Sequence, residues 1–142
     1  MTGGSRHRAR RAALQALYQW DLTHGAPGDV EAHFIAEHEL AGVDLAYFRE
    51  LIREIPRRHR HLDDQLPSHL DRAFDDVDPV ERAILRIGVY ELEFHAEIPY
   101  RVILDEAVEL AKTFGAEHSY RFVNGVLDKV AAQLRSHEAK PA

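Results

Sequence analysis

Arginine side chains near the N-terminus are the residues whose type and spacing most clearly suggest a chemistry. The first thirteen residues contain no acid and four arginines: Arg6, Arg8, Arg10 and Arg11. Guanidinium groups neutralise phosphates, and an aromatic ring such as that of Tyr18 can stack on a base. One short basic segment with an aromatic ring suits the splayed bases of single-stranded RNA better than a duplex groove. Two interpretations of these arginines are equally supported by composition alone: they bind RNA, or they only solubilise a frayed terminus.

A second group of residues with similar chemistry lies toward the C-terminus. Arg121, Phe122 and Asn124 follow Ser119, which is a good N-cap for a helix. An aromatic residue at a helix start is by default part of the core, so Phe122 alone is weak support for a binding surface.

Enzymatic catalysis has few candidate residues in this sequence. Ten histidines are present but no HExxH motif, so solvated or partly packed histidines are preferred to a zinc site. The four serines lie near predicted helix ends or tails, where serine is normally a cap. The carboxylate pairs Asp63–Asp64 and Asp75–Asp76 are interpreted as surface charge. We therefore predict no catalytic residue, no bound metal and no cofactor.

The composition indicates a cytoplasmic protein with an uneven charge distribution. The net charge is −6, and since the first thirteen residues carry +4, the remaining residues carry −10. No apolar run approaches the roughly 20 residues of a membrane span, and no apolar segment typical of a secretory signal follows the basic N-terminus. The absence of cysteine excludes disulfides, thiol catalysis and cysteine-based zinc sites.

Helical periodicity runs through the chain, and the alternation typical of strands is not sustained anywhere. Glycine, proline and aspartate divide it into about seven helices, including a short one that starts at Pro67, and Pro56 should kink or break the third. Asn124-Gly125, which would favour a hairpin between strands, is interpreted as part of the last helix. We expect an all-α domain over residues 1–142 with two helical lobes, at about 5–75 and 78–137. The longer helices are expected at about residues 9–24, 30–41, 45 onward, 79–94, 101–114 and 120–134.

The segment from Asp78 to Phe94 is expected to be the central, buried helix. Asp78 is a natural N-cap before Pro79, and apolar residues follow on nearly every side of the helix. A narrow polar stripe contains Arg86, which we expect at a seam between packed helices. Gly88 is interpreted as the point where another helix crosses closely.

Three stretches resemble the NusB family of bacterial transcription antitermination factors: ARRAALQALYQWD, VERAILRIGVYEL and IPYRVILDEAVELAKTFGAEHSYRFVNGVLDKV. The resemblance covers about residues 6–130, and FVNGVLDKV is its most specific part. It implies an all-helical fold of two helical bundles and no catalysis. It also implies partners: the ribosomal protein NusE, single-stranded boxA RNA of ribosomal RNA leaders, and the antitermination complex of RNA polymerase with other Nus factors.

The resemblance also implies roles for particular residues of this chain. RNA contacts are expected from Arg6, Arg8, Arg10, Tyr18, Arg86, Arg121, Phe122 and Asn124. Contacts to NusE are expected from Asp76 and Glu81. In this interpretation Arg86 would lie at an exposed seam where RNA passes.

Two other functions remain as alternatives at this stage. The chain could be an adaptor whose acidic body binds a basic ribosomal protein, with incidental RNA contacts. The same fold also resembles the accessory domain of ribosomal RNA cytosine methyltransferases. Against the second alternative, the 142 residues leave no length for a cofactor-binding domain, and no catalytic cysteine is present.

Overall fold

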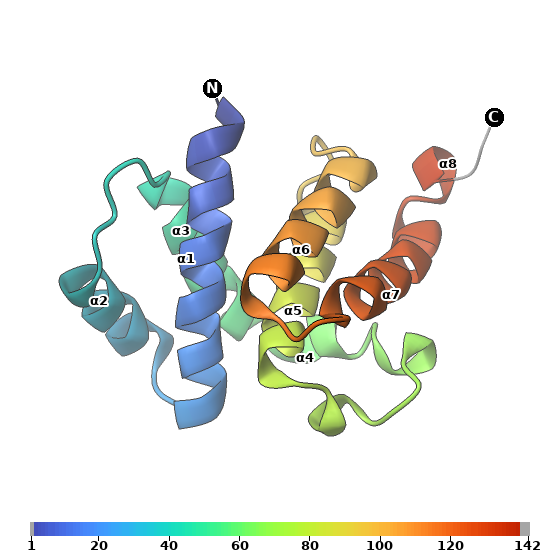
Figure 1. Ribbon diagram of the computed structural model, residues 1–142, viewed down its shortest axis with the longest axis horizontal. Helices are drawn as coiled ribbons and strands as arrows, with labels where there is room; N and C mark the ends of the chain where they lie inside the picture. The colour runs from blue at the N-terminus through green and yellow to red at the C-terminus, as the bar shows by residue number, and fades with distance from the viewer. Residues whose placement is uncertain (1, 140–142) are drawn as a thin grey trace. The chain divides into compact units, whose positions relative to one another are not determined.

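The computed structural model describes residues 2–139, and all regular secondary structure in this range is helical (Figure 1). The all-α prediction is therefore confirmed. None of the helices in the described range combines the length and apolar character needed to cross a membrane. The α-helices are α1 (Thr2–Thr23), α2 (Pro27–Glu37), α3 (Leu45–Arg57), α4 (His59–Asp63), α5 (Pro79–Phe94), α6 (Tyr100–Phe114), α7 (Ser119–Leu134) and α8 (Ser136–Ala139), with 3₁₀ turns η1 (Pro67–His69) and η2 (Phe74–Asp76).

The chain divides into two compact units after Arg58, whereas the sequence suggested a division between residues 75 and 78. The reason is that the segment after α4 packs within the second unit. Arg82 of α5 donates hydrogen bonds to the carbonyls of Asp75 and Val77, at 3.3 and 2.7 Å. The acidic loop is therefore tied to the start of α5 and does not separate the two units.

In the first unit, α1 packs along α3, and α2 covers one side of this pair (Figure 1). The α1 face toward the core includes alanines that permit a close approach, beside the buried Leu14 and Leu17, and α3 contributes further large apolar side chains. The fully buried members are Ala9, Ala13, Ala16, Phe48, Leu51, Ile52 and Ile55. The ends of helix α2 also differ from prediction. Pro27 takes the first helical position, and the helix ends at Glu37 because His38 is extended.

Helix α1 begins seven residues earlier than its apolar pattern suggested. The basic N-terminal segment is therefore helical, and Ser5 in its first turns accepts a backbone hydrogen bond from Asp44 at 3.1 Å. Pro56 does limit α3, as expected, since the helix ends one residue later, at Arg57.

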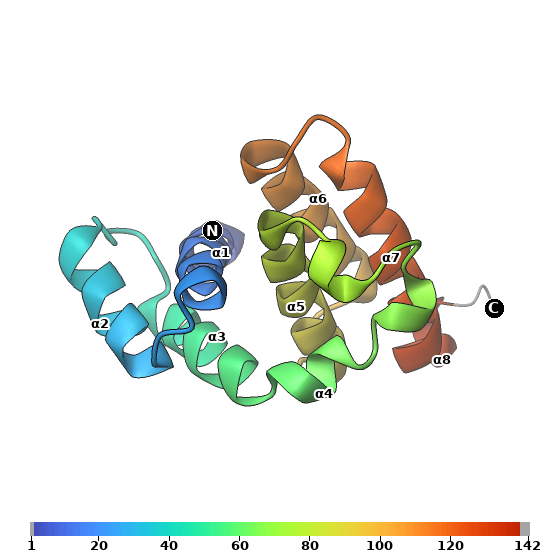
Figure 2. The same ribbon diagram turned by 90° about the horizontal axis from the view of Figure 1, so that it is seen from below.

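In the second unit, α5 packs against both α6 and α7, which also pack against each other (Figure 2). The Asp78 carboxylate accepts hydrogen bonds from the backbone N–H groups of Val80 and Glu81 at 2.8 and 3.4 Å, which confirms the predicted cap. The interpretation of Gly88 is confirmed as well. A Cβ atom at Gly88 would come within 2.6 Å of the Leu127 side chain of α7.

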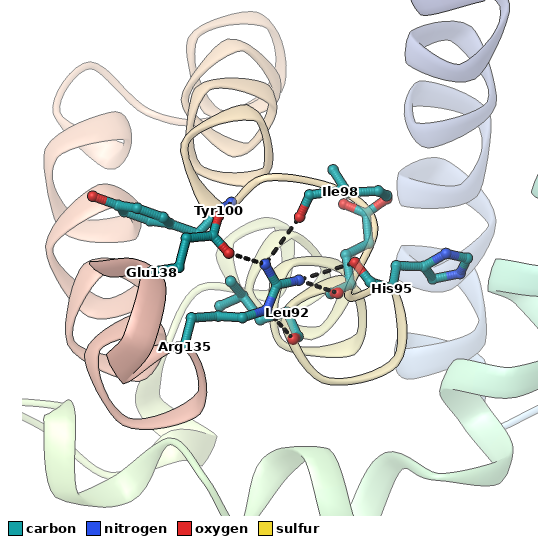
Figure 3. Close-up of polar contacts among 7 residues, drawn as sticks. Leu92, His95, Ile98, Tyr100, Arg135 and Glu138 are labelled. Carbon is teal, nitrogen blue, oxygen red and sulfur yellow. Dashed lines mark hydrogen bonds and ion pairs between the residues drawn. The ribbon is translucent and has the colours of Figure 1, made fainter. Parts of the chain in front are cut away.

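Arg135 holds the far end of α5, as Figure 3 shows. Its buried guanidinium donates to the carbonyls of Leu92, Ile98 and His95 at 2.8, 2.9 and 2.9 Å. The Glu138 carboxylate accepts from Arg135 at 2.8 Å and from the Tyr100 backbone N–H at 2.7 Å. Pro99 offers no side-chain cap to α6, so Glu138 supplies that cap from α8, a helix that the sequence pattern did not predict.

Candidate nucleic-acid interface

The first unit presents a row of side chains along the exposed face of α1. Arg8, Arg11, Gln15 and Tyr18 are all exposed, as their spacing of three, four and three residues predicts. Tyr18 is 37% exposed, so part of its ring is accessible to solvent. The row therefore combines cations for phosphates with a ring that is open for stacking.

Arg6 and Arg10 occupy a different face of α1 and both meet the ring of Tyr47 in α3. Their guanidinium carbons lie 4.2 and 5.6 Å from the ring centroid, within the range of cation–π interactions. Arg6 is half-buried and Arg10 is only 3% exposed. Arg10 therefore does not belong to the exposed row, because a residue four positions after Arg6 follows it onto the side that faces α3.

The second unit carries its own pair of cation and aromatic ring. The Arg72 guanidinium lies 4.6 Å from the ring centroid of Phe122, which is half-buried and so is not an ordinary core residue. Arg72 also binds Asp71 through two hydrogen bonds of 2.7 and 3.3 Å. The hydrogen bond from Arg72 lowers the pKa of the Asp71 carboxyl group. The sequence did not indicate Arg72 as a candidate binding residue, because it lies in an irregular segment far from Phe122 along the chain.

Arg121 and Asn124 are exposed on α7. The Arg121 Nε donates a hydrogen bond of 3.1 Å to the hydroxyl oxygen of Tyr120. Together with Arg72 and Phe122, these side chains give the second unit the same chemistry as the α1 row: exposed hydrogen-bond donors next to an accessible ring.

Arg86 does not lie at an exposed seam. It is 5% exposed and donates two hydrogen bonds of 2.9 Å each to the Asp63 carboxylate, with its guanidinium 5.1 Å from the centroid of the Phe74 ring. Asp63 had been interpreted as surface charge, and that interpretation is also wrong. A charge on a buried helix requires a partner, and Asp63 of α4 provides it.

The two residues expected to contact NusE differ in accessibility. Asp76 is exposed in η2, whereas Glu81 is 8% exposed in the first turn of α5.

Comparison with known proteins agrees with this description. The NusB family matches residues 7–132 of the chain. The transcription antitermination protein NusB of Shewanella denitrificans is 52% identical over 92% of this chain and 98% of its own length. Its counterpart in Nitrosococcus oceani is 54% identical over 94% of this chain and 89% of its own length.

Solved structures show the same fold. A crystal structure of the antitermination factors NusB and NusE in complex with dsRNA contains a chain that superposes with a TM-score of 0.78, at 30% identity, over 89% of this chain and 96% of that chain. NusB of T. maritima superposes with a TM-score of 0.77, at 32% identity, over 90% of this chain and 91% of that chain. The match extends over nearly the whole chain in both sequence and structure, and the protein therefore belongs to the NusB family.

Proposed function

We propose that this protein is a non-catalytic transcription antitermination factor that acts in the cytoplasm. It pairs with the ribosomal protein NusE and binds single-stranded boxA RNA of ribosomal RNA leaders. In the antitermination complex with other Nus factors, it supports read-through of terminators by RNA polymerase. The observation that carries the proposal is the exposed row on α1, in which arginines lead to an accessible tyrosine ring.

Burial divides the expected RNA-contacting residues into two groups. Arg8, Tyr18, Arg121 and Asn124 are exposed, and Arg6 and Phe122 are half-buried, so these six residues are proposed as direct contacts, together with the exposed Arg11 of the α1 row. Arg10 and Arg86 are buried, and we assign them a structural role in the fold, through Tyr47 and Asp63. Asp76 and Glu81 are proposed on the surface that meets NusE, with Asp76 the more accessible of the two.

The experiment that tests the function is a titration of labelled boxA RNA against a scrambled single strand, with and without NusE. We expect boxA to bind more tightly than the scrambled strand and NusE to increase that affinity. The structure with NusB and NusE named above contains dsRNA, so a duplex competitor belongs in the same titration. Exposed rings favour unpaired bases, and a duplex that displaces boxA at equal concentration would contradict the single-strand assignment.

The salt dependence of binding gives the first quantitative prediction. Four phosphate contacts from the N-terminal arginines would give a slope of log affinity against log salt of about −2.8. Because Arg10 is buried, we expect only Arg6, Arg8 and Arg11 to contribute, and hence about −2.1 from this segment. The Arg8→Gln variant should reduce the slope by about 0.7, whereas Arg57→Gln, which changes an exposed arginine on α3, should not. A slope near zero for the unmodified protein would contradict the proposal.

An adaptor function is the second candidate, and the observation that favours it is the charge of −10 outside the basic segment. An acidic body attracts a basic ribosomal protein with or without RNA. If NusE binds but does not increase the affinity for boxA, the adaptor function is preferred.

A further inference from the structure

A pocket of about 180 Å³ opens within the first unit, between α1 and the segment that joins α2 to α3. It begins at the exposed row of α1, two of whose arginines contribute to its wall. The lining side chains are Arg8, Arg11, Ala12, Gln15, Phe34, His38, Glu39, Leu40 and Val43. The pocket therefore continues the proposed RNA surface into a concave site to which no role has been assigned.

One wall of the pocket is a stack of two rings. His38 lies parallel to Phe34, with 3.8 Å between the ring centroids and an angle of 12° between the planes. Phe34 is buried and His38 is exposed, so the imidazole face turned away from Phe34 is open. A planar ring could extend this stack by one layer, with Ala12, Leu40 and Val43 as its apolar surroundings.

Two polar side chains at this wall, His38 and Glu39, offer acceptor atoms. His38 Nδ1 lies 3.1 Å from the Phe34 carbonyl oxygen, which can only accept, so Nδ1 carries the proton. In the neutral ring Nε2 is then an acceptor, and the Glu39 carboxylate accepts as well. A ligand ring with its own N–H donors fits these groups better than one with only acceptors.

Arg8, which lines the pocket, lies close to the backbone of Gly42. The backbone of Gly42 has φ +81°, a conformation that favours glycine, and a Cβ atom there would collide with Nη1 of Arg8. The loop thus leaves room for the guanidinium to lie across it. With Arg11 on the next turn of α1, the pocket has two cations beside a stacking wall.

The volume limits the ligand to a small one. A cavity of about 150 Å³ is known to hold a benzene molecule, whereas pockets for drug-sized ligands begin at about 300 Å³. A volume near 180 Å³ therefore fits one six-membered ring.

We propose that this pocket receives one unstacked pyrimidine of the single-stranded RNA, an inference that rests on the proposed RNA-binding function. The base stacks on His38 and donates its N3–H or 4-amino hydrogens to Glu39 and His38. The neighbouring phosphates meet Arg8 and Arg11.

The test combines base removal in the RNA with removal of the stacking ring in the protein. A set of labelled boxA RNAs, each lacking the base at one position, is titrated against the unmodified protein and against His38→Ala. His33→Ala is the matched control, since His33 is an exposed histidine of α2 that does not line the pocket. We expect one pyrimidine position at which base loss weakens binding of the unmodified protein and of the control about tenfold. In His38→Ala that loss should largely disappear, because the two changes remove the same contact.

A second measurement tests binding of a single nucleotide to the pocket, in the absence of the oligonucleotide. Uridine monophosphate is titrated into isotope-labelled protein, and the backbone amide NMR signals of residues 38–43 are followed. We expect these signals to shift more with uridine monophosphate than with inorganic phosphate alone. If neither titration moves them, or if base removal affects the unmodified protein and His38→Ala equally while boxA still binds, the pocket assignment is overturned and the RNA-binding function stands. Failure of boxA to bind above the scrambled strand overturns the function itself.

Discussion

At the scale of single residues, burial distinguishes the arginines that are available to bind RNA from those that stabilise the fold. Arg8 and Arg10 lie two positions apart on α1, yet Arg8 is exposed and Arg10 is 3% exposed against Tyr47. Arg86 is likewise buried against Asp63. An arginine in a basic segment or on a polar stripe is therefore not automatically a phosphate ligand. Its neighbours in space decide whether the guanidinium remains available.

The Arg86–Asp63 pair leads to a prediction that separates support from RNA contact. Asp63→Asn should lower the free energy of unfolding by about 3 kcal/mol, because Arg86, which is 5% exposed, loses the carboxylate that it binds. Arg86→Gln should lower it less, because the Asp63 side chain is 18% exposed and His59 Nδ1 lies 3.6 Å from its Oδ2. Both variants should bind boxA as the unmodified protein does at temperatures where they are folded. Urea denaturation and RNA titration provide the two measurements. Should Arg86→Gln lose RNA affinity while Asp63→Asn retains it, Arg86 would be a direct ligand and the assignment of a purely structural role would be wrong.

Part of this residue-scale picture could be predicted from the sequence and part could not. Helical spacing is enough to place Arg8, Arg11 and Tyr18 on one exposed face, because that face depends only on local geometry. The partners of Arg86 and Phe122 could not be predicted. They are Asp63 and Arg72, which come from segments 23 and 50 residues away, and no local pattern encodes those contacts.

At the scale of helices, two glycines show that the surroundings of a helical glycine decide how its replacement by alanine affects stability. Gly88 in α5 faces Leu127, which is fully buried, whereas Gly125 in α7 has open space where a Cβ atom would lie. Both lie inside helices, where glycine costs up to about 1 kcal/mol relative to alanine. Substitution by alanine should therefore have opposite effects at the two positions.

We predict that Gly125→Ala raises the free energy of unfolding by about 0.5–1 kcal/mol, through helix propensity alone. Gly88→Ala should lower it by about 1 kcal/mol, because overpacking of about 1–3 kcal/mol outweighs the same propensity gain. Leu127→Val added to Gly88→Ala should recover part of the loss by making room. Urea denaturation of the four proteins checks this, and a stabilising effect of Gly88→Ala would show that Leu127 can move at little cost.

The end of α5 depends on Arg135, which donates to the Leu92 carbonyl in the last turn of the helix and to the Ile98 carbonyl just beyond it. We predict that Arg135→Met lowers the free energy of unfolding by about 3 kcal/mol, since it leaves buried acceptors without donors. The stability of Arg135→Lys should lie between that of the unmodified protein and that of Arg135→Met, because an ammonium group cannot reach as many carbonyls as the planar guanidinium. Thermal denaturation followed by circular dichroism provides the measurement. Equal stability of the Met and Lys variants would show that the charge and its geometry matter little.

At the scale of the whole molecule, the sequence predicted the helices better than their grouping. Seven helices were expected, and the central helix from Asp78 to Phe94 was placed correctly because its cap and its apolar residues are local signals. The division after Arg58 was not predicted. It depends on Asp63, Phe74 and Arg82, whose contacts attach the segment before α5 to the second unit.

Each unit also has its own carboxylate that ties helices together. In the first unit, Glu31 of α2 accepts two hydrogen bonds from Arg53 of α3, at 2.7 and 2.8 Å. In the second, Glu138 accepts from Tyr100 and Arg135. The hydrogen bond from Arg53 lowers the pKa of Glu31, and the backbone hydrogen bond from Tyr100 lowers that of Glu138, both below the ordinary value of 4.5. Because both pKa values are lowered in the folded state, their stabilising effect is complete above about pH 5. It is lost as the pH falls through the folded-state values.

The Glu31→Gln substitution should therefore lower the stability of the first unit, and this loss should be largest at near-neutral pH. Trp20 is the single tryptophan of the chain and lies in α1, so its fluorescence reports on that unit. We predict that the urea midpoint from Trp20 fluorescence falls in the unmodified protein between pH 6 and pH 3. In Glu31→Gln the midpoint should be lower at pH 6 and should fall less over the same range, because the carboxylate that becomes protonated is already absent. Glu138→Gln, which changes the other unit, is the matched control and should leave the pH dependence of this signal as it is. Parallel pH profiles for Glu31→Gln and the unmodified protein would mean that the Glu31–Arg53 pair contributes no stability that depends on its charge.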